Sequence, residues 1–277
     1  MKNLEERLLD EYFGIDTDLR RQAEARLAAK EPLAYILGDT VFFAEKYSVS
    51  PAVLIPRPDT ERVVEWALKL LPEGGRFLDL CCGSGCIAIS TLCHSRNTEA
   101  VLLDISEEAL EVAKKNALQN GVYDRCTFLL ADVKKDGLPE ERFDLIVSNP
   151  PYVVSSIVDT LEEECRYEPR IAFDGGLDGG DFYRLFLEIC PRHLKEWGKM
   201  VFEIGYDQRA LLSKLCERHG FSFEKSRDAL LFLKLGVFGG FLCNFQKFSG
   251  RRKIKVLQQR HNKKHTVERW KGYSKQK

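Results

Sequence analysis

Residues 77–86 read FLDLCCGSGC, a short strand pattern followed by a turn that contains two glycines. Residues 87–93 are mostly apolar and suit a short helix, and the next apolar run, 100–103, ends at Asp104. A strand, a tight glycine turn, a helix and a second strand form one βαβ unit, whose two strands are parallel. The stretch therefore predicts a parallel sheet.

The alternation of strand and helix patterns continues along the chain. Further strands are expected at 127–130, 143–147, 200–204 and 221–223, and further helices at 106–120, 182–194 and 208–218. Apolar strands separated by helices indicate a sheet that is covered on both faces. We therefore predict a doubly wound, mostly parallel α/β domain, whose ligand lies at the carboxyl ends of the strands.

A different pattern precedes this domain. Residues 2–30 have helical spacing with a break at Gly14. Short β-prone runs between residues 42 and 55 are split by Glu45-Lys46 and Ser50-Pro51, which predicts a β-hairpin. Pro58 suits the first turn of a helix and predicts the start of the next one.

Composition limits the class of protein. The chain has 277 residues, of which 44% are apolar and 30% charged, so it can bury a full core. The longest apolar run, 229–243, contains Lys234 and is shorter than the ~20 residues that a bilayer requires. The N-terminus is charged and amphipathic, unlike a secretory signal. We expect a cytoplasmic protein without a membrane span.

The nine cysteines also fit the cytoplasm, because an odd number in a chain of this length argues against a disulfide framework. Cys82 and Cys86 have the spacing of a metal-ligand pair, but no second pair follows at zinc spacing. We therefore expect no metal site and interpret these cysteines as small turn and core residues.

Charge is distributed unevenly along the chain. The 42 basic and 42 acidic residues cancel, but residues 234–277 hold 13 lysines and arginines and a single acid, Glu268. That segment carries +12, and the remainder carries −12. A body this acidic has no broad nucleic-acid footprint. We expect nucleic-acid contact, if any, only through the basic C-terminal tail.

The turn after the first strand is a candidate cofactor loop made of Cys81, Cys82, Gly83, Ser84 and Gly85. Two glycines so close together let the backbone approach a ligand. Asp104, at the end of the next strand, can accept the two hydroxyls of a ribose. Asp79 favours a positively charged ligand over a diphosphate, and S-adenosyl-L-methionine carries a sulfonium and an ammonium. A βα turn without a cofactor, and an Asp104 that only caps a helix, are the structural alternatives.

The chemistry is expected at Ser148-Asn149-Pro150-Pro151-Tyr152, directly after the strand at 143–147. The two prolines stiffen the loop and remove two amide donors. The Asn149 side-chain oxygen and the Pro150 carbonyl can each accept one N–H of a planar –NH2 group, on which the Tyr152 ring can stack. Two acceptors would orient the nitrogen lone pair and stabilise the positive charge that develops on nitrogen. We predict Asn149, Pro150 and Tyr152 as catalytic residues; a loop that only ends the strand is the alternative.

These residues resemble the class I methyltransferases of the Asn-Pro-Pro-Tyr type, and more closely the HemK-type release-factor glutamine N5-methyltransferases. The resemblance covers about residues 31–228. It also rests on EPLAYILG at 31–38, LIPRPDTE at 54–61, and YEPR at 167–170 followed by DGG at 174–176. It implies methylation, with S-adenosyl-L-methionine as donor, of the side-chain amide of the glutamine in the Gly-Gly-Gln motif of peptide chain release factors.

The resemblance also assigns residues and a fold. Cofactor contacts fall on the loop at 81–85, on Asp104, on Val133 beside the adenine and on Asn149. Binding of the target glutamine falls on the four residues Asn149, Pro150, Pro151 and Tyr152. The implied fold is a seven-stranded methyltransferase sheet preceded by a helical segment and a β-hairpin.

The sequence departs from the family pattern at three places. Cys81 replaces the first loop glycine of the family, a replacement that requires a negative φ at Cys81. The helical segment is short. An extension that is first apolar and then basic follows the usual end of the domain. We expect residues 229–235 to supply the final strand. The expected parts are a helical segment at 1–38, a hairpin linker at 39–57, the methyltransferase domain at 58–235 and the basic extension at 236–277.

Two other functions are compatible with the motifs. The same loop geometry grips the amino group of a nucleobase, adenine N6 or guanine N2 of DNA or rRNA, although no target-recognition domain is evident. A non-catalytic RNA-binding adaptor on a methyltransferase scaffold is the second, because aromatic residues accompany the basic ones in the tail. We expect a monomer that acts on release factors.

Overall fold

The computed structural model describes residues 3–15, 17–225 and 229–234. Expectations that concern the basic extension at 236–277, its contacts with nucleic acid among them, lie outside the described residues. None of the described helices is both long enough and apolar enough to cross a membrane.

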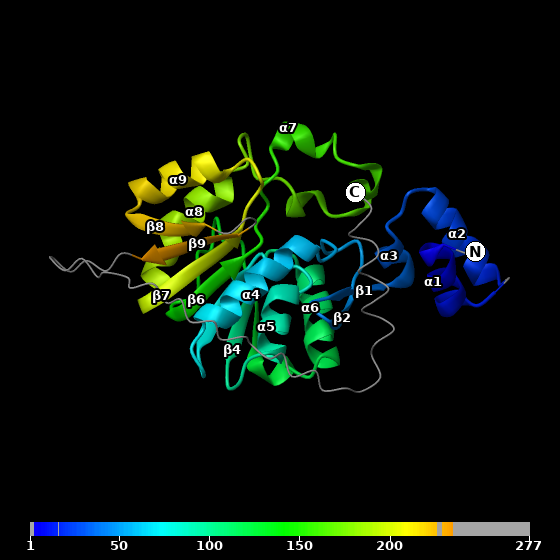
Figure 1. Cartoon of the computed structure of the whole chain (residues 1–277), viewed down its shortest axis with the longest axis horizontal. Helices are drawn as coiled ribbons and strands as arrows, with labels where there is room; N and C mark the ends of the chain where they lie inside the picture. Colours follow the sequence, from blue (N-terminus) through cyan, green and yellow to red (C-terminus); the bar gives the residue numbers. More distant parts are fainter. Residues whose placement is uncertain (1–2, 16, 226–228, 235–277) are drawn as a thin grey trace. The chain divides into compact units, whose positions relative to one another are not determined.

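The described strands of the main domain form a seven-stranded sheet in the order β5-β4-β3-β6-β7-β9-β8 (Figure 1). The strand bounds are β3 Arg76–Leu80, β4 Glu99–Asp104, β5 Cys126–Leu130, β6 Phe143–Ser148, β7 Leu194–Glu203, β8 Phe221–Lys225 and β9 Ala229–Lys234. Strands β5, β4, β3, β6 and β7 run parallel to one another, and β9 is antiparallel to both of its neighbours, β7 and β8. The predicted doubly wound, mostly parallel sheet is confirmed, and residues 229–234 supply the expected additional strand.

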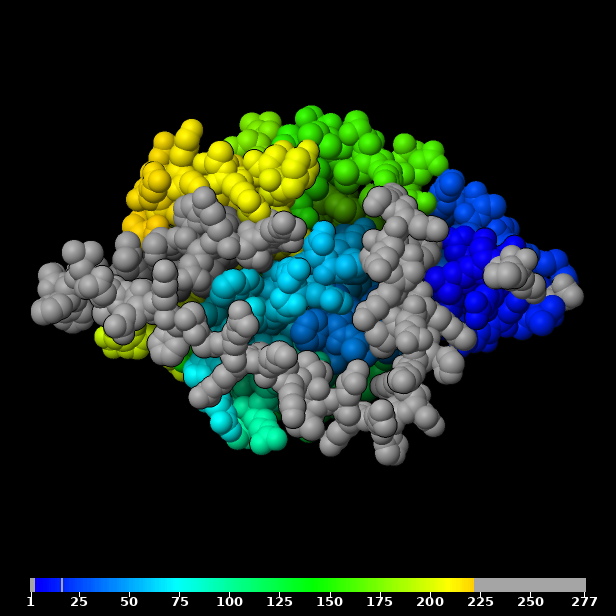
Figure 2. Space-filling model, in the orientation of Figure 1, coloured from blue at the N-terminus to red at the C-terminus, as the bar shows by residue number. Residues whose placement is uncertain are grey.

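Helices cover both faces of the sheet, as Figure 1 shows. The bounds are α4 Glu61–Leu70, α5 Cys86–Cys93 and α6 Glu107–Gln119 on one face, and α8 Asp181–Ile189 and α9 Arg209–Arg218 on the other. Neighbouring residues of β3 face opposite cores, because side chains alternate along a strand: Phe77 packs with the first set of helices and Leu78 with the second. Figure 2 shows the surface of the α4 segment in cyan below the yellow surface of the C-terminal helices.

The boundary between α8 and β7 differs from the prediction. The helix expected at 182–194 ends at Ile189, a 3-10 turn follows at Cys190–His193, and β7 starts at Leu194 rather than at residue 200. Pro191 explains the early end of the helix, because proline has no amide proton to donate to the carbonyl one turn earlier.

Helices α1 Leu4–Phe13, α2 Asp18–Ala28 and α3 Leu33–Leu37 precede the hairpin of β1 Asp39–Phe42 and β2 Glu45–Ser48. The turn was expected at Glu45-Lys46 but lies at Phe43-Ala44, whose φ angles are +50° and +74°. Two positive φ values match the tight turn that suits the twist of a hairpin. Glu45 and Lys46 therefore belong to the second strand.

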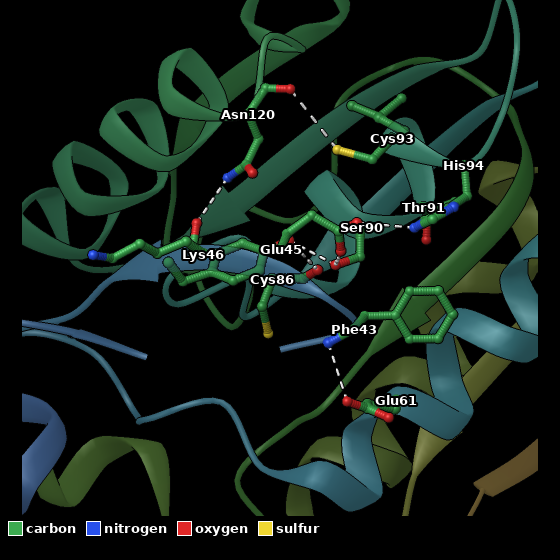
Figure 3. Close-up of polar contacts among 12 residues, drawn as sticks. Phe43, Glu45, Lys46, Glu61, Cys86, Ser90, Thr91, Cys93, His94 and Asn120 are labelled. Atoms are coloured by element: carbon green, nitrogen blue, oxygen red, sulfur yellow. Dashed lines mark hydrogen bonds and ion pairs between the residues drawn. The ribbon is translucent and has the colours of Figure 1, made fainter. Parts of the chain in front are cut away.

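The hairpin is bonded to α5, the helix that follows the glycine turn (Figure 3). The Glu45 carboxylate accepts a hydrogen bond from the Ser90 hydroxyl at 3.0 Å and pairs with His94 Nε2 at 2.9 Å. The Tyr47 and Ser90 hydroxyls are 2.6 Å apart. The hydrogen bond with Glu45 raises the pKa of His94. Together these contacts attach the hairpin to α5, the helix that follows the turn at 81–85.

Candidate active site

A cavity of about 350 Å³ lies at the carboxyl ends of the parallel strands, within the range of about 300–1,000 Å³ that is usual for small-molecule sites. The predicted residues that line it are Cys81, Cys82, Gly83, Ser84, Asp104, Val133, Asn149 and Pro151. The predicted residues Asp79, Gly85, Pro150 and Tyr152 do not line it. The cavity is therefore where the topology predicts it.

The turn at 81–85 folds back onto the end of β4. The Cys82 amide donates to the Leu103 carbonyl at 3.1 Å, and the Gly85 amide donates to the Cys82 carbonyl at 2.8 Å. Gly85 has φ +76°, and a Cβ atom on it would lie 2.9 Å from Ile89 Cδ1. Gly85 therefore allows α5 to pack closely against the sheet and does not itself border the cavity.

The expectation of a negative φ at Cys81 is wrong, because its φ is +56°. The turn needs left-handed backbone at this position, which glycine adopts freely and other residues adopt at a cost of about 1–2 kcal/mol. Its side chain packs partly against the core on the α8 side of the sheet. Cysteine therefore occupies a glycine position at the cost of local strain.

Asp104 holds the turn in place through two backbone amides. Its Oδ2 accepts from Gly83 N at 2.8 Å, and its Oδ1 accepts from Ser106 N at 3.0 Å. Burial raises its pKa, and these amides oppose the rise. The residue that caps α6 is Ser106, whose hydroxyl accepts from Ala109 N, so the alternative that Asp104 only caps this helix is wrong. Each Asp104 oxygen retains room to accept another hydrogen bond.

Asp79 is fully buried behind the turn. Its Oδ2 accepts from Ala88 N in the first turn of α5 at 3.0 Å, whereas Oδ1 has no hydrogen-bond partner in the described part of the chain. Burial raises its pKa to about 8. Asp79 therefore bonds the first turn of α5 from outside the cavity lining, and its expected preference for a positively charged ligand stays a prediction.

The register of the sheet places Asn149 next to the turn. Leu80 and Ser148 are partners across β3 and β6, and the Ser148 hydroxyl donates to the Leu80 carbonyl at 2.6 Å. Asn149 follows immediately and lines the cavity, and its Nδ2 donates to Thr60 Oγ1 at 3.1 Å. Within the described residues, Oδ1 of Asn149 has no hydrogen-bond partner. A free amide oxygen therefore lies beside the cofactor turn.

Tyr152 is anchored away from the cavity. Its hydroxyl donates to Glu203 Oε1 at 3.1 Å, and its carbonyl accepts from Gln208 Nε2 at 2.8 Å. The ring packs against the core on the α8 side. Burial raises the pKa of Glu203 to about 6, and the neighbouring hydroxyls of Thr60 and Tyr152 oppose the rise. Stacking of Tyr152 on a substrate stays a prediction.

The sequence analysis assigned no role to four supporting residues: Thr60, Asn116, Glu168 and Glu203. Thr60 and Glu168 lie in the motifs at 54–61 and 167–170 that carry the family resemblance. Asn116 is fully buried, and its Nδ2 donates to the Ser84 carbonyl at 2.9 Å and to the Ser48 carbonyl at 3.0 Å, which joins the turn to the hairpin. Glu168 pairs with Arg57 and accepts from Ile55 N at 2.9 Å. A signal was present for Glu203, an acid at the end of an apolar strand.

The chemistry of the lining suits a nucleoside on one side and a carboxamide on the other. Asp104 offers carboxylate oxygens to hydroxyls, and Asn149 offers an amide oxygen to N–H donors. Among the described residues, no group of three or more His, Cys, Asp or Glu side chains is placed to hold a metal ion.

Comparisons with known proteins identify methyltransferases that are similar to this chain. The model of the methyltransferase small domain family matches residues 62–163. The chain is 41% identical over 198 residues to a release factor glutamine methyltransferase of Geobacter sulfurreducens, covering 71% of this chain and 69% of that protein. It is 37% identical over 223 residues to one of Clostridium botulinum, covering 79% of this chain and 76% of that protein.

Solved structures support the fold. A methyltransferase of Pyrococcus furiosus superposes with a TM-score of 0.54 and 22% identity, covering 78% of this chain and 99% of that one. At this identity the likeness concerns the fold alone.

Proposed function

The chain belongs to the release factor glutamine methyltransferases, and from this premise we propose that it methylates the glutamine side-chain amide in the Gly-Gly-Gln motif of peptide chain release factors. The methyl donor is S-adenosyl-L-methionine. The observation that carries the proposal is the position of Asn149, which lines the cavity beside the turn at 81–85 while its amide oxygen has no partner among the described residues.

The residues of the cavity fit this donor. The turn residues 81–84, which line the cavity, would lie against the donor, the Asp104 oxygens would accept its ribose hydroxyls, and Val133 would border its adenine. Asp79 lies buried outside the lining of the cavity, so an effect of its carboxyl group on the positive charge of the donor would act without direct contact. When bound, the donor supplies a methyl group on a positively charged sulfur.

The loop at 149–152 receives the target glutamine. Asn149 Oδ1 and the Pro150 carbonyl each accept one N–H of the carboxamide, which orients the nitrogen lone pair and stabilises the positive charge that develops on it. A hydrogen-bonding group that is held in place before the reaction stabilises the transition state electrostatically, and each such group raises the rate about 10²–10³-fold. The two prolines keep the loop stiff, and Gln208 and Glu203 hold Tyr152 at its end.

Three finer features complete the proposal. The parts of the chain are the helical segment at 1–38, the hairpin linker at 39–57 and the methyltransferase domain at 58–235. The protein acts as a monomer, because each chain carries both the cofactor turn and the amide-binding loop. Since its substrates work in translation, we place the reaction in the cytoplasm.

The test is methyl transfer by the full-length protein. Purified release factor, rRNA and DNA are each incubated with methyl-labelled S-adenosyl-L-methionine. We expect label on the release factor, on the peptide that contains Gly-Gly-Gln, and no label on a release factor whose motif glutamine is replaced. Label on rRNA or DNA alone would refute the proposal in favour of a nucleobase methyltransferase.

A further inference from the structure

The segment at 53–57, which precedes α4, borders the cavity as an extended stretch of chain. Ile55 and Arg57 each precede a proline, and a residue before proline is restricted to extended backbone. Arg57 has φ −97° and ψ 144°, in agreement with this rule. Leu54, Pro56 and Arg57 line the cavity, whereas Ile55 packs against a buried apolar cluster instead.

The backbone of this segment is bonded by side chains at alternate residues. The Val53 carbonyl accepts from the Tyr35 hydroxyl at 2.6 Å, and the Ile55 N–H donates to Glu168 Oε2 at 2.9 Å. The Ile55 carbonyl accepts from Arg57 Nη1 at 3.1 Å. Tyr35 and Glu168 are buried, and Glu168 also pairs with Arg57. These bonds hold the segment in its extended form.

The residues between the bonded ones have unpaired backbone groups. The N–H and the carbonyl of Leu54 and the carbonyl of Pro56 have no hydrogen-bond partner among the described residues. In an extended chain, the N–H and carbonyl of one residue point to one side and those of the next residue to the opposite side. The free groups of Leu54 and Pro56 therefore lie on the side away from the bonded groups of Val53 and Ile55.

An extended edge with a free N–H and free carbonyls can pair with another extended peptide. Such pairing uses main-chain hydrogen bonds, which are the same for every residue type except proline. An added strand projects its side chains to both of its faces, and in a cavity glycine is the residue that needs no room for them. The edge thus suits a segment that contains glycines.

The same edge lies close to the group that we propose as the amide acceptor. Thr60, at the end of the turn that follows Arg57, accepts from Asn149 Nδ2 at 3.1 Å. Leu54 and Asn149 line one cavity of about 350 Å³. A glutamine whose side chain reaches Asn149 therefore brings its own main chain, and the residues next to it, toward Leu54.

We propose that Leu54 and Pro56 form a docking edge that binds the main chain of the substrate at the two glycines beside the target glutamine. The inference rests on the proposed function for the identity of that substrate. The Leu54 N–H donates to a substrate carbonyl, and the Leu54 and Pro56 carbonyls accept from substrate N–H groups. Main-chain pairing explains how a site can recognise residues that have no side chain.

The first test is hydrogen exchange at the Leu54 amide of the full-length protein. An amide without a partner exchanges fast, so we expect fast exchange in the protein alone and with S-adenosyl-L-homocysteine, the donor without its methyl group. Saturation with release factor in the presence of this compound should slow the exchange about tenfold or more. Unchanged exchange overturns the inference. Protection by S-adenosyl-L-homocysteine alone also overturns it, because Leu54 would then contact the donor.

A release factor whose motif glutamine is replaced serves as a control in the same measurement. Its main chain is unchanged, so at saturation it should protect the Leu54 amide as the natural release factor does. Protection that is lost with the glutamine would show that the side chain, and not the main chain, is recognised at Leu54. That result overturns the inference.

The second test removes the single N–H. The α-hydroxy acid analogue of leucine at position 54 keeps the Leu54 side chain and replaces the N–H by an ester oxygen. This Leu54 ester should raise KM for release factor about fivefold, the effect of one hydrogen bond. Its kcat should stay near that of the wild type, because the bond is made equally in the bound substrate and in the transition state.

The matched control is the same ester at Leu177. Leu177 is 92% exposed and does not line the cavity, so its ester should keep the KM of the wild type. Thermal melting and calorimetry with S-adenosyl-L-methionine show whether both esters fold and bind the donor. A wild-type KM in the Leu54 ester, or an equal rise of KM in both esters, overturns the inference.

The two tests separate this inference from the proposed function. Methyl transfer to release factor without protection of the Leu54 amide overturns the docking edge and leaves the proposed function intact. Protection of the Leu54 amide by release factor without methyl transfer refutes the proposed function and leaves the docking edge intact.

Discussion

The two halves of the cavity are built in different ways. On the cofactor side, the bonded groups of the turn at 81–85 belong to its backbone: amides donate to Asp104 and to the carbonyl of Leu103, and the Ser84 carbonyl accepts from Asn116. On the substrate side, the bonded groups include the side chains of the loop itself: Asn149 donates to Thr60, and Tyr152 donates to Glu203. Bonds to the backbone fix the path of the turn whatever its side chains are, whereas bonds to side chains fix the orientation of the groups that we propose to act on the substrate.

The largest expected effect tests the substrate side. Asn149→Ala removes the amide oxygen that we propose as an acceptor, and it should lower methyl transfer by about 1,000-fold. Affinity for S-adenosyl-L-methionine should fall much less than transfer, because Asn149 is one of several residues assigned to the donor and the turn at 81–85 is held without it. Kinetics with release factor and calorimetry with the donor measure the two effects. Near-normal turnover would contradict the role of Asn149.

The next effect tests the cofactor side. Asp104→Ala removes the proposed acceptor of the ribose hydroxyls and frees the Gly83 amide, so the dissociation constant for the donor should rise about tenfold to a hundredfold. Asp104→Asn keeps the shape and one acceptor, and should lie between alanine and wild type. Titration calorimetry measures the constants. An unchanged dissociation constant in Asp104→Ala would contradict the proposal that Asp104 accepts hydrogen bonds from the ribose hydroxyls.

A smaller effect concerns Asp79, which connects the cofactor side to the core. The pKa of Asp79 is 3.8 in the unfolded state and about 8 in the folded state. Between these two pH values the folded protein therefore keeps a proton on Asp79 that the unfolded protein has lost. Its contribution to stability is therefore present below pH 3.8 and is lost progressively as the pH rises to about 8. Asp79→Asn should flatten this dependence of the ligand-free protein between pH 6 and 8, as measured by urea unfolding. An identical slope in both proteins would show that Asp79 is already ionised.

The smallest effect tests the backbone strain of the turn. Cys81 has φ +56°, whereas Cys82 is not among the described residues with positive φ. Cys81→Gly relieves the strain and should cost less stability than Cys82→Gly, by about 1 kcal/mol. The two variants lose similar side chains, so their difference in unfolding midpoint reports the conformation. Equal losses would mean that Cys81 is not strained.

The general architecture was predictable because it is written in local patterns. Apolar strands that alternate with helices predicted the parallel sheet, and the fold class predicted a ligand at the carboxyl ends of its strands. The sheet order confirms the first prediction, and the cavity that Asp104 and Asn149 line is placed where the second expects the ligand. The hairpin was predicted too, but its turn was not, since Phe43 and Ala44 do not have the residue types that usually adopt positive φ.

The amino-acid sequence by itself thus determined the class of fold, the cofactor turn and the loop that follows β6, because each of these depends on residues close together in the chain. Only the tertiary structure decided which side chains support them. Asp79 turned out to lie behind the turn, and Thr60 and Glu203 came to lie beside the amide-binding loop although they are 89 and 51 residues from Asn149 and Tyr152. Such contacts depend on the register of strands and on the packing of helices, neither of which leaves a periodic signal in the sequence.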